Sequence, residues 1–202
     1  VGVTGTNGKT TVSYVVDSML RAAGKTTALV GTIQYHVAGE VRPAPNTTPE
    51  SLDLYRLFQR LAENGGTHVT MEVSSHALAL GRVYGLRFHT ALFTNLTRDH
   101  LDFHGTMEEY FAAKKLLFEG CGAPPPRFAG INLDDPRGRE LPAPPETRRF
   151  GYGMGAEADV RARNIDIRPD GLRFDLDLAG RTVAVRSGLI GLINVYNILA
   201  AS

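Results

Sequence analysis

The sequence of 202 residues holds a single cysteine, Cys121, so an internal disulfide is excluded. It also lacks any run of apolar residues long enough to cross a bilayer. Charge of one sign does not dominate, since 22 Lys and Arg residues stand against 21 Asp and Glu residues. These absences fit a reducing, cytoplasmic setting, and they argue against a membrane partner and a basic nucleic-acid surface.

Apolar residues make up 43% of the chain and charged residues 21%, the balance of a globular α/β protein. Strands are expected at 26–32, 68–73, 90–94 and 128–133, the first and third of them buried. Helices are expected at 12–23, 48–63, 77–81 and 106–118, with Thr48 as the N-cap of the second. Strands that alternate with helices predict an α/β core over residues 1–150, with a P-loop-type, doubly wound, mostly parallel sheet.

Residues 151–190 have a different pattern. Short alternating segments at 160–167, 172–178 and 182–186 are separated by turn sequences and not by helices. This pattern predicts a C-terminal antiparallel β meander attached to the α/β core. A last apolar helix is expected over 195–201, and Asn194 precedes it at a position that is also compatible with a helix cap.

The segment Gly5-Thr-Asn-Gly-Lys-Thr-Thr11 follows a short apolar strand and precedes a helix. A glycine-rich turn at a helix N-terminus presents N–H groups and partial positive charge to a phosphate chain. Lys9 is placed to reach the terminal phosphates and Thr10 to hold a magnesium ion. Val3 stands where the longer motif has glycine, so this is a compressed form. The expected nucleotide-binding residues are Gly5, Thr6, Asn7, Gly8, Lys9, Thr10 and Thr11.

Other chemistry-bearing residues follow the strands whose carboxyl ends should meet this loop. Glu72 ends an apolar strand, where a carboxylate can coordinate a hard magnesium ion. The next strand leads into the Asp- and His-rich stretch 95–104 and then into the helix that carries Lys114. Because Lys114 shares a helix face with apolar residues, we expect its side chain to be buried, which is costly for an unpaired ammonium.

Four segments of the chain together resemble the central ATPase domain of the Mur ligases, which assemble the peptide of bacterial peptidoglycan. They are Gly5–Thr11, Glu72–His76, Asn95–His104 and Tyr110–Lys114. A fifth segment, Asn46-Thr-Thr-Pro49, favours the branch of the family that adds the third amino acid. The resemblance extends over essentially the whole chain.

The resemblance implies an ATP-dependent amide ligase. Enzymes of this branch phosphorylate the terminal carboxylate of UDP-N-acetylmuramoyl-L-Ala-D-Glu, and the amine of meso-diaminopimelate or L-lysine then attacks the acyl phosphate. By resemblance, Lys9 holds the β- and γ-phosphates, while Thr10 and Glu72 hold the first magnesium ion. His100 matches the ligand of the second magnesium ion. Lys114 matches a lysine that is carbamylated, which replaces a buried cation by an anion that faces the metals.

The resemblance also indicates which residues contact the substrates. Those for the nucleotide-sugar peptide are Asn46, Thr47, Thr48, Ser74 and Arg82, and those for adenine are Asn194 and Asn197. Arg82 is suited to a bidentate contact with an anion. Leu80 stands where many ligases of this branch have glutamine, so that polar contact is not expected here.

Mur ligases carry a UDP-binding domain before the central domain and an amino-acid-binding domain after it. We expect residues 1–202 to be the central domain without these two, inactive or weakly active as an isolated piece. Such a piece does not by itself choose between diaminopimelate and lysine. The protein is expected to be a cytoplasmic bacterial monomer.

Two alternatives remain open at the level of sequence. One is another ligase built on this domain, such as a folylpolyglutamate or cyanophycin synthetase. The other is a non-catalytic nucleotide-binding module that uses the phosphate loop as a switch. In that second case the convergence of Glu72, His100 and Lys114 on one edge would have no explanation.

Overall fold

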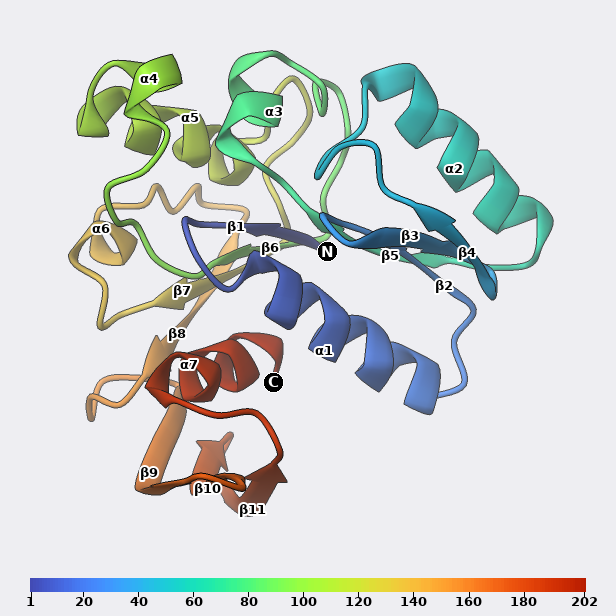
Figure 1. Cartoon of the computed structure of the whole chain (residues 1–202). Helices are drawn as coiled ribbons and strands as arrows, with labels where there is room; N and C mark the ends of the chain where they lie inside the picture. The colour runs from blue at the N-terminus through green and yellow to red at the C-terminus, as the bar shows by residue number, and fades with distance from the viewer.

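A computed structural model describes all residues from 1 to 202 as a mixed α/β fold (Figure 1). The strands are β1 (Gly2–Thr4), β2 (Thr27–Val30), β3 (Gln34–Val37), β4 (Glu40–Pro43), β5 (His68–Glu72), β6 (Thr90–Phe93), β7 (Phe128–Asn132), β8 (Arg148–Gly153), β9 (Val160–Arg168), β10 (Gly171–Leu178) and β11 (Arg181–Ser187). The helices are α1 (Lys9–Ala22), α2 (Ser51–Glu63), α3 (Ser75–Ala79), α4 (Leu101–His104), α5 (Met107–Glu119), α6 (Pro136–Arg139) and α7 (Leu192–Ala201).

All the strands belong to one sheet, in the order β11-β10-β9-β8-β7-β6-β1-β5-β2-β3-β4. Neighbouring strands are parallel across the centre of this sheet, from β2 at one side to β9 at the other. The strand pairs at both ends of the sheet are antiparallel. The chain moves outward from β1 in one direction to β2 and later in the other direction to β6 and β7. The carboxyl end of β1 is therefore a switch point, where doubly wound sheets bind their ligands.

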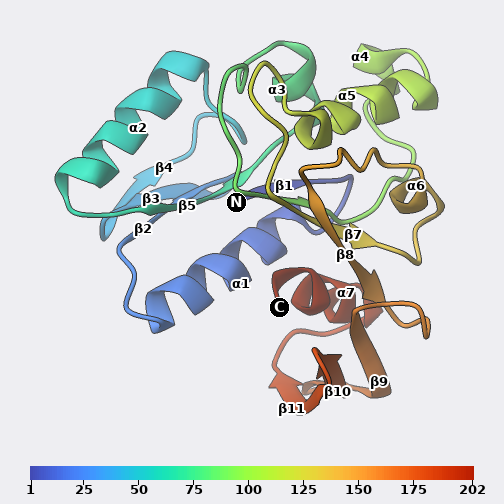
Figure 2. The ribbon, with the colours of Figure 1, turned by 180° about the vertical axis from the view of Figure 1, so that it is seen from behind.

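Helices cover both faces of the parallel part of the sheet. Helices α2, α3 and α5 lie on one face, and α1 and α7 lie on the other (Figures 1 and 2). The side chains of β6 point alternately to the two faces of the sheet, as successive residues of a strand do. Ala91 and Phe93 belong to the core beneath α5, whereas Leu92 belongs to the core beneath α1 and α7.

Local sequence signals set the ends of the helices that flank the switch point. Helix α1 is followed by Gly24 at φ 75°, the left-handed position in which glycine commonly ends a helix. Helix α5 begins with a capping box, in which Thr106 and Glu109 satisfy each other's backbone N–H groups. The helix expected at 106–118 is thereby confirmed with bounds shifted by one residue, to Met107–Glu119, and it presents Lys114 from its buried face.

The structure corrects several details of the expected elements. Helix α2 begins at Ser51 with Glu50 as its N-cap, so the prediction that Thr48 caps this helix is wrong. Helix α7 begins at Leu192 after Gly191, so Asn194 lies in its first turn and is not its cap. Strand β8 and the one-turn helices α4 and α6 were not anticipated, because such short elements lack a clear periodicity.

The C-terminal strands form the expected antiparallel meander, with β9 paired to β10 and β10 paired to β11. They remain part of the main sheet, because β9 pairs in parallel with β8 at Tyr152 and Val160. The predicted fold class is confirmed, while a unit boundary at residue 150 stays a prediction. No helix has the length and apolar character needed to span a membrane.

Candidate nucleotide site at the end of β1

The glycine-rich loop lies at the switch point, between the end of β1 and the start of α1. Gly8 adopts a left-handed conformation with φ 87°, which an L side chain would strain. Lys9 folds back over the loop, and its Nζ donates to the carbonyl oxygens of Gly5 at 2.8 Å and Thr6 at 2.9 Å. Burial lowers the pKa of Lys9, and the negative charges of Glu72 and Asp99 oppose that shift.

The segment after β6 holds the backbone of this loop. The Thr6 N–H donates to the Asn95 carbonyl oxygen at 2.8 Å, and the Asn7 N–H donates to Asn95 Oδ1 at 2.9 Å. The Thr94 hydroxyl donates to the Asn7 carbonyl oxygen at 2.6 Å. A Cβ on Gly5 would lie 1.9 Å from Thr94 Oγ1, so only glycine permits this approach. Thr94 and Asn95 were not predicted as site residues, although Asn95 opens the Asp- and His-rich stretch.

Glu72 lies next to the start of α1, as predicted. It is buried, and its Oε2 accepts hydrogen bonds from the hydroxyls of Thr10 and Thr32, each at 3.0 Å. Its Oε1 accepts from the Thr32 N–H at 2.8 Å. The approach is close, since a Cβ on Gly31 would lie 2.4 Å from Oε1. Thr32 is an addition to the predicted set, and its position as the last residue of the strand expected at 26–32 was the available signal.

Lys114 is 1% exposed, and its side chain reaches the phosphate loop from α5. Its Nζ donates to the Gly5 carbonyl oxygen at 3.0 Å and lies 4.3 Å from the centre of the Tyr110 ring. Burial holds the pKa of Lys114 well below its ordinary value, the nearby Lys9 cation lowers it further, and Asp99 opposes both effects. The predicted burial of this lysine is confirmed. Lys9 and Lys114 therefore meet on the same carbonyl group.

His100 lies on the α4 side of this edge. It is the N-cap of α4 in a left-handed conformation with φ 51°. Its side chain is 43% exposed, with Nε2 at 3.5 Å from Asp99 Oδ2, and its ring centre is 6.0 Å from that of Tyr110. The structure contains no group of three or more His, Cys, Asp and Glu side chains arranged to hold a metal. Among the predicted metal-binding residues, Thr10 and Glu72 contact each other directly. Lys114 reaches the phosphate loop at Gly5.

Most of the predicted substrate residues gather beside the end of β5. The buried Thr48 hydroxyl donates to the Glu72 carbonyl oxygen at 2.8 Å and accepts from the Ser74 N–H at 3.1 Å. Arg82 donates to the Thr48 carbonyl oxygen at 3.1 Å and forms an ion pair with Glu50. Instead of capping α2, Thr48 joins the loop before that helix to the strand that ends in Glu72.

The two residues before Thr48 are more open. Thr47 Oγ1 lies 3.2 Å from Thr32 Oγ1, which places Thr47 next to the Glu72 contacts. Asn46 is exposed, and its carbonyl oxygen accepts from the Tyr35 hydroxyl. Its amide side chain is therefore presented at the surface of the same loop.

Helix α7 brings the two predicted adenine-contacting residues to the other side of the phosphate loop. Asn197 is buried, and its Oδ1 lies so close to Gly8 that a Cβ there would be 2.2 Å away. Asn197 Nδ2 donates to Asn194 Oδ1 at 2.9 Å, and Asn194 Nδ2 donates to the Ile190 carbonyl oxygen at 2.8 Å. Residues from both ends of the chain thus form one wall of the site.

Comparison with known proteins identifies the family of this chain. A family profile described as the Mur ligase middle domain matches residues 3–202. The chain belongs to the Mur ligase family.

Two curated relatives have the name UDP-N-acetylmuramoyl-L-alanyl-D-glutamate--2,6-diaminopimelate ligase. The one from Solibacter usitatus is 64% identical over 200 residues, which are 99% of this chain and 40% of that protein. The one from Geobacillus thermodenitrificans is 47% identical over 206 residues, which are 100% of this chain and 42% of that protein. A solved structure of a ligase with the same name has a TM-score of 0.89 at 33% identity, covering 99% of this chain and 41% of that one.

These relatives confirm the resemblance to the Mur ligases and to the branch that adds the third residue, known as MurE. The chain spans about two fifths of the length of the relatives it matches, with coverages of 40% and 42%. It corresponds to the middle domain of that family.

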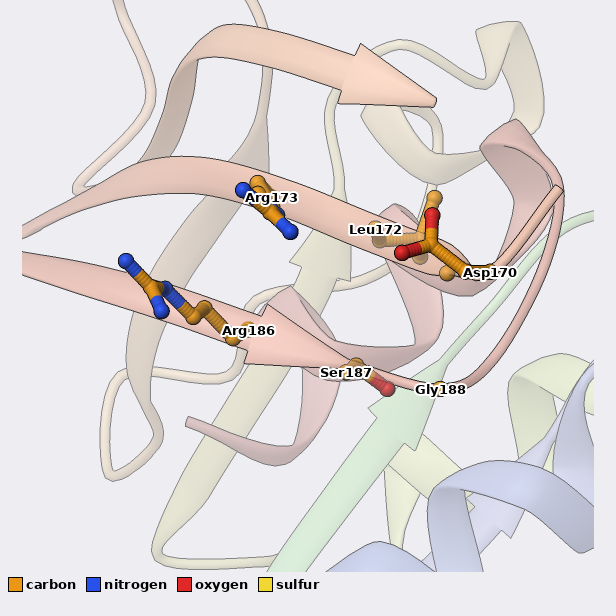
Figure 3. A pocket seen from close by; sticks show the side chains of 7 residues that line it. Asp170, Leu172, Arg173, Arg186, Ser187 and Gly188 are labelled. Carbon is orange, nitrogen blue, oxygen red and sulfur yellow. The ribbon is translucent and has the colours of Figure 1, made fainter. Parts of the chain in front are cut away.

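A separate hollow of about 260 Å³ lies in the meander of this Mur ligase domain, where β10 begins and β11 ends (Figure 3). Arg173 and Arg186 project beside it from directly opposite positions on the two strands. Both arginines are exposed, and no predicted site residue lines the hollow. The candidate site is therefore defined by the phosphate loop and its contacts.

Proposed function

We propose that the complete protein is a MurE-type ligase that uses ATP to join diaminopimelate to UDP-N-acetylmuramoyl-L-Ala-D-Glu. In this proposal the present domain holds ATP and activates the substrate carboxylate. One observation carries the assignment: the Thr10 hydroxyl meets the buried Glu72 carboxylate while Lys9 and Lys114 both reach the Gly5 carbonyl. The names of the relatives support diaminopimelate as the added amino acid.

The donor set fits magnesium. Thr10 Oγ1 and Glu72 Oε2 are oxygen atoms 3.0 Å apart at the N-terminus of a helix, and hard divalent cations prefer oxygen ligands. We assign Thr10 and Glu72 to one Mg²⁺ and His100, with a modified Lys114, to a second. When bound, Mg²⁺ neutralises charge on the triphosphate during phosphoryl transfer.

The residues of this chain position ATP for attack by the substrate. The N–H groups of the first turn of α1 have no partners within the helix and can donate to phosphate oxygens. Lys9 is assigned to the β- and γ-phosphates, where its cation offsets the charge that develops in the transition state. Asn194 and Asn197 are assigned to adenine, because they lie against the loop at Gly8.

The reaction proceeds in two displacements. A carboxylate oxygen of the substrate attacks the γ-phosphorus of ATP, ADP leaves, and an acyl phosphate forms. The amine of diaminopimelate then attacks the acyl carbon, an amide bond forms, and phosphate leaves with the amine giving up a proton. The residues assigned to hold the nucleotide-sugar peptide for this attack are Asn46, Thr47, Thr48, Ser74 and Arg82.

Lys114 is assigned as the carbamylated lysine. Its lowered pKa increases the share of the neutral amine, whose nitrogen attacks the carbon of CO₂ to form an N–C bond. One proton leaves the nitrogen, and the resulting carbamate is an anion. This exchange removes a buried cation that lies near Lys9 and places negative charge beside the phosphate loop.

The test uses the full-length protein with ATP and UDP-N-acetylmuramoyl-L-Ala-D-Glu, supplied with either meso-diaminopimelate or L-lysine. We expect phosphate release and a tripeptide product with diaminopimelate. Turnover with a folate substrate alone would overturn the assignment, and nucleotide binding without any turnover would support the non-catalytic alternative. Mass spectrometry of the native protein under CO₂ should find the mass of one CO₂ added at Lys114, whereas the isolated residues 1–202 should bind ATP without ligase turnover.

A further inference from the structure

A hydrogen bond between two buried side chains joins α3 to α4. His104 Nε2 lies 2.9 Å from Ser75 Oγ, and the two residues are 8% and 1% exposed. Both follow predicted site residues closely in sequence, Ser75 after Ser74 and His104 after His100. Neither residue has a role in the proposed reaction. Because a buried polar pair is costly unless its partners satisfy each other, the two segments are held at a fixed separation.

Helix α4 needs contacts outside itself to hold its position, and the hydrogen bond between His104 and Ser75 is one of them. It is a single turn of four residues, which is too short to be stable by its own backbone hydrogen bonds. The carbonyl oxygen of His100 accepts from the N–H groups of Phe103 at 3.2 Å and His104 at 3.0 Å. The turn that His104 anchors is therefore the same turn that orients His100, whose left-handed backbone also needs external support.

The anchor continues to the phosphate loop through Tyr110. The rings of His104 and Tyr110 are 5.1 Å apart, and the Tyr110 hydroxyl lies 3.2 Å from Thr6 Oγ1. The same Tyr110 ring receives the Lys114 ammonium on its face. One connected set of contacts thus relates α3, the turn that bears His100, and the loop that bears Lys9.

We propose that His104 is a positioning residue that, through Ser75 and Tyr110, holds the α4 turn so that His100 can ligate the second magnesium ion. This inference rests on the proposed function, because His100 is assigned as a ligand there. His104 itself touches neither nucleotide nor metal in this scheme. Residues that orient a metal ligand typically change metal affinity by about 10- to 100-fold when they are replaced.

The test compares full-length variants. His104→Leu removes the hydrogen bond, His104→Gln keeps a donor and acceptor near the Nε2 position, and His89→Leu is the matched control. His89 is exposed before β6, away from the phosphate loop. Mg²⁺ is titrated calorimetrically into each protein with a non-hydrolysable ATP analogue, and the Mg²⁺ dependence of phosphate release is measured separately.

For His104→Leu we expect about a 10-fold or larger rise in the Mg²⁺ concentration needed for half-saturation and half-maximal rate. The KM for the nucleotide-sugar peptide should stay unchanged, His104→Gln should recover most of the loss, and His89→Leu should match the unaltered protein. A folded His104→Leu protein with unaltered Mg²⁺ dependence would overturn the inference.

Ser75→Ala provides a second route if His104→Leu does not fold. It removes the partner of His104 while leaving the ring in place, and we expect a smaller shift of the Mg²⁺ midpoint in the same direction. An unchanged midpoint in folded Ser75→Ala overturns the inference. Failure of the proposed function is distinguished from this result, because the unaltered full-length protein would then show no ligase turnover.

Discussion

The edge around the phosphate loop and the C-terminal meander use polar side chains in opposite ways. At the edge, polar contacts are buried or half-buried and join residues far apart in the chain, such as Thr10 with Glu72 and Lys114 with Gly5. In the meander, Arg163 pairs with Asp177 on a neighbouring strand, where the Arg163 side chain is 44% and the Asp177 side chain 30% exposed. The first arrangement concentrates charge where water is scarce, and the second leaves it in solvent.

This difference matters because a buried charge interacts strongly with its surroundings, while an exposed pair is screened by water and salt. Removing one partner at the edge leaves an uncompensated group in a poorly solvated place. Removing one partner in the meander returns the other to water at little cost. Substitutions at the edge should therefore change activity or stability more than substitutions in the meander.

The largest effect is expected for Lys9→Ala. Because Lys9 is the cation assigned to the β- and γ-phosphates, its loss should lower ligase turnover of the full-length protein by about 10²- to 10³-fold. The matched change in the meander, Arg173→Ala, should leave turnover unaltered. Steady-state phosphate release and calorimetric ATP binding measure both. Equal losses in the two variants would contradict the contrast.

A smaller effect is expected for Gly31→Ala. The new Cβ would lie 2.4 Å from Glu72 Oε1, so the carboxylate must move from its contacts with Thr10 and Thr32. Such overpacking typically costs about 1–3 kcal/mol of unfolding free energy. Gly188→Ala is the control, because its Cβ would have no heavy atom within 4 Å. Urea unfolding and ATP affinity are measured for both variants. Similar urea midpoints for Gly31→Ala and Gly188→Ala would refute the prediction.

The pH dependence of stability gives a third contrast. The pKa of His104 lies below its ordinary value because the ring is buried and because His76 and Lys114 disfavour its cation. As the pH falls, His104 is therefore protonated at a higher pH in the unfolded chain than in the folded one. The contribution of neutral His104 to folding stability is present above about pH 6.5 and is lost as the pH falls further. Urea midpoints measured across this range should fall on acidification, and less steeply in His104→Gln. Parallel slopes for the two proteins would rule out this origin.

The smallest effect is expected in the meander. Hydrogen bonds from Arg163 and Thr182 lower the pKa of Asp177 to about 2. The contribution of its carboxylate to folding stability is therefore present above pH 3.8 and is lost only as the pH falls toward 2. Arg163→Ala should raise the pKa of Asp177 toward 3.8 while Tm at neutral pH stays nearly constant. An NMR titration of Asp177 together with thermal unfolding tests this, and a large fall in Tm would show that the exposed pair matters more than expected.

Much of the candidate site could be predicted because its signals are local. The phosphate loop is a contiguous motif, Glu72 ends a strand that must finish at the same edge, and the helical spacing around Lys114 indicated a buried lysine. Thr32, Thr94 and Asn95 were missed, since a single polar residue after a strand does not reveal its partner. Thr48 was misinterpreted as a helix cap, because its residue type suits a cap as well as a contact with β5.

The sequence by itself determined the alternation of strands and helices, the phosphate loop and the family, since these depend on periodicity and on residues close together in the chain. Tertiary structure alone decided that Asn197 lies against Gly8 and that His104 bonds to Ser75. Contacts of this kind join segments that approach each other only after the sheet has formed and its helices have packed on both faces. They follow from side chains meeting in three dimensions, where burial makes each polar partner necessary.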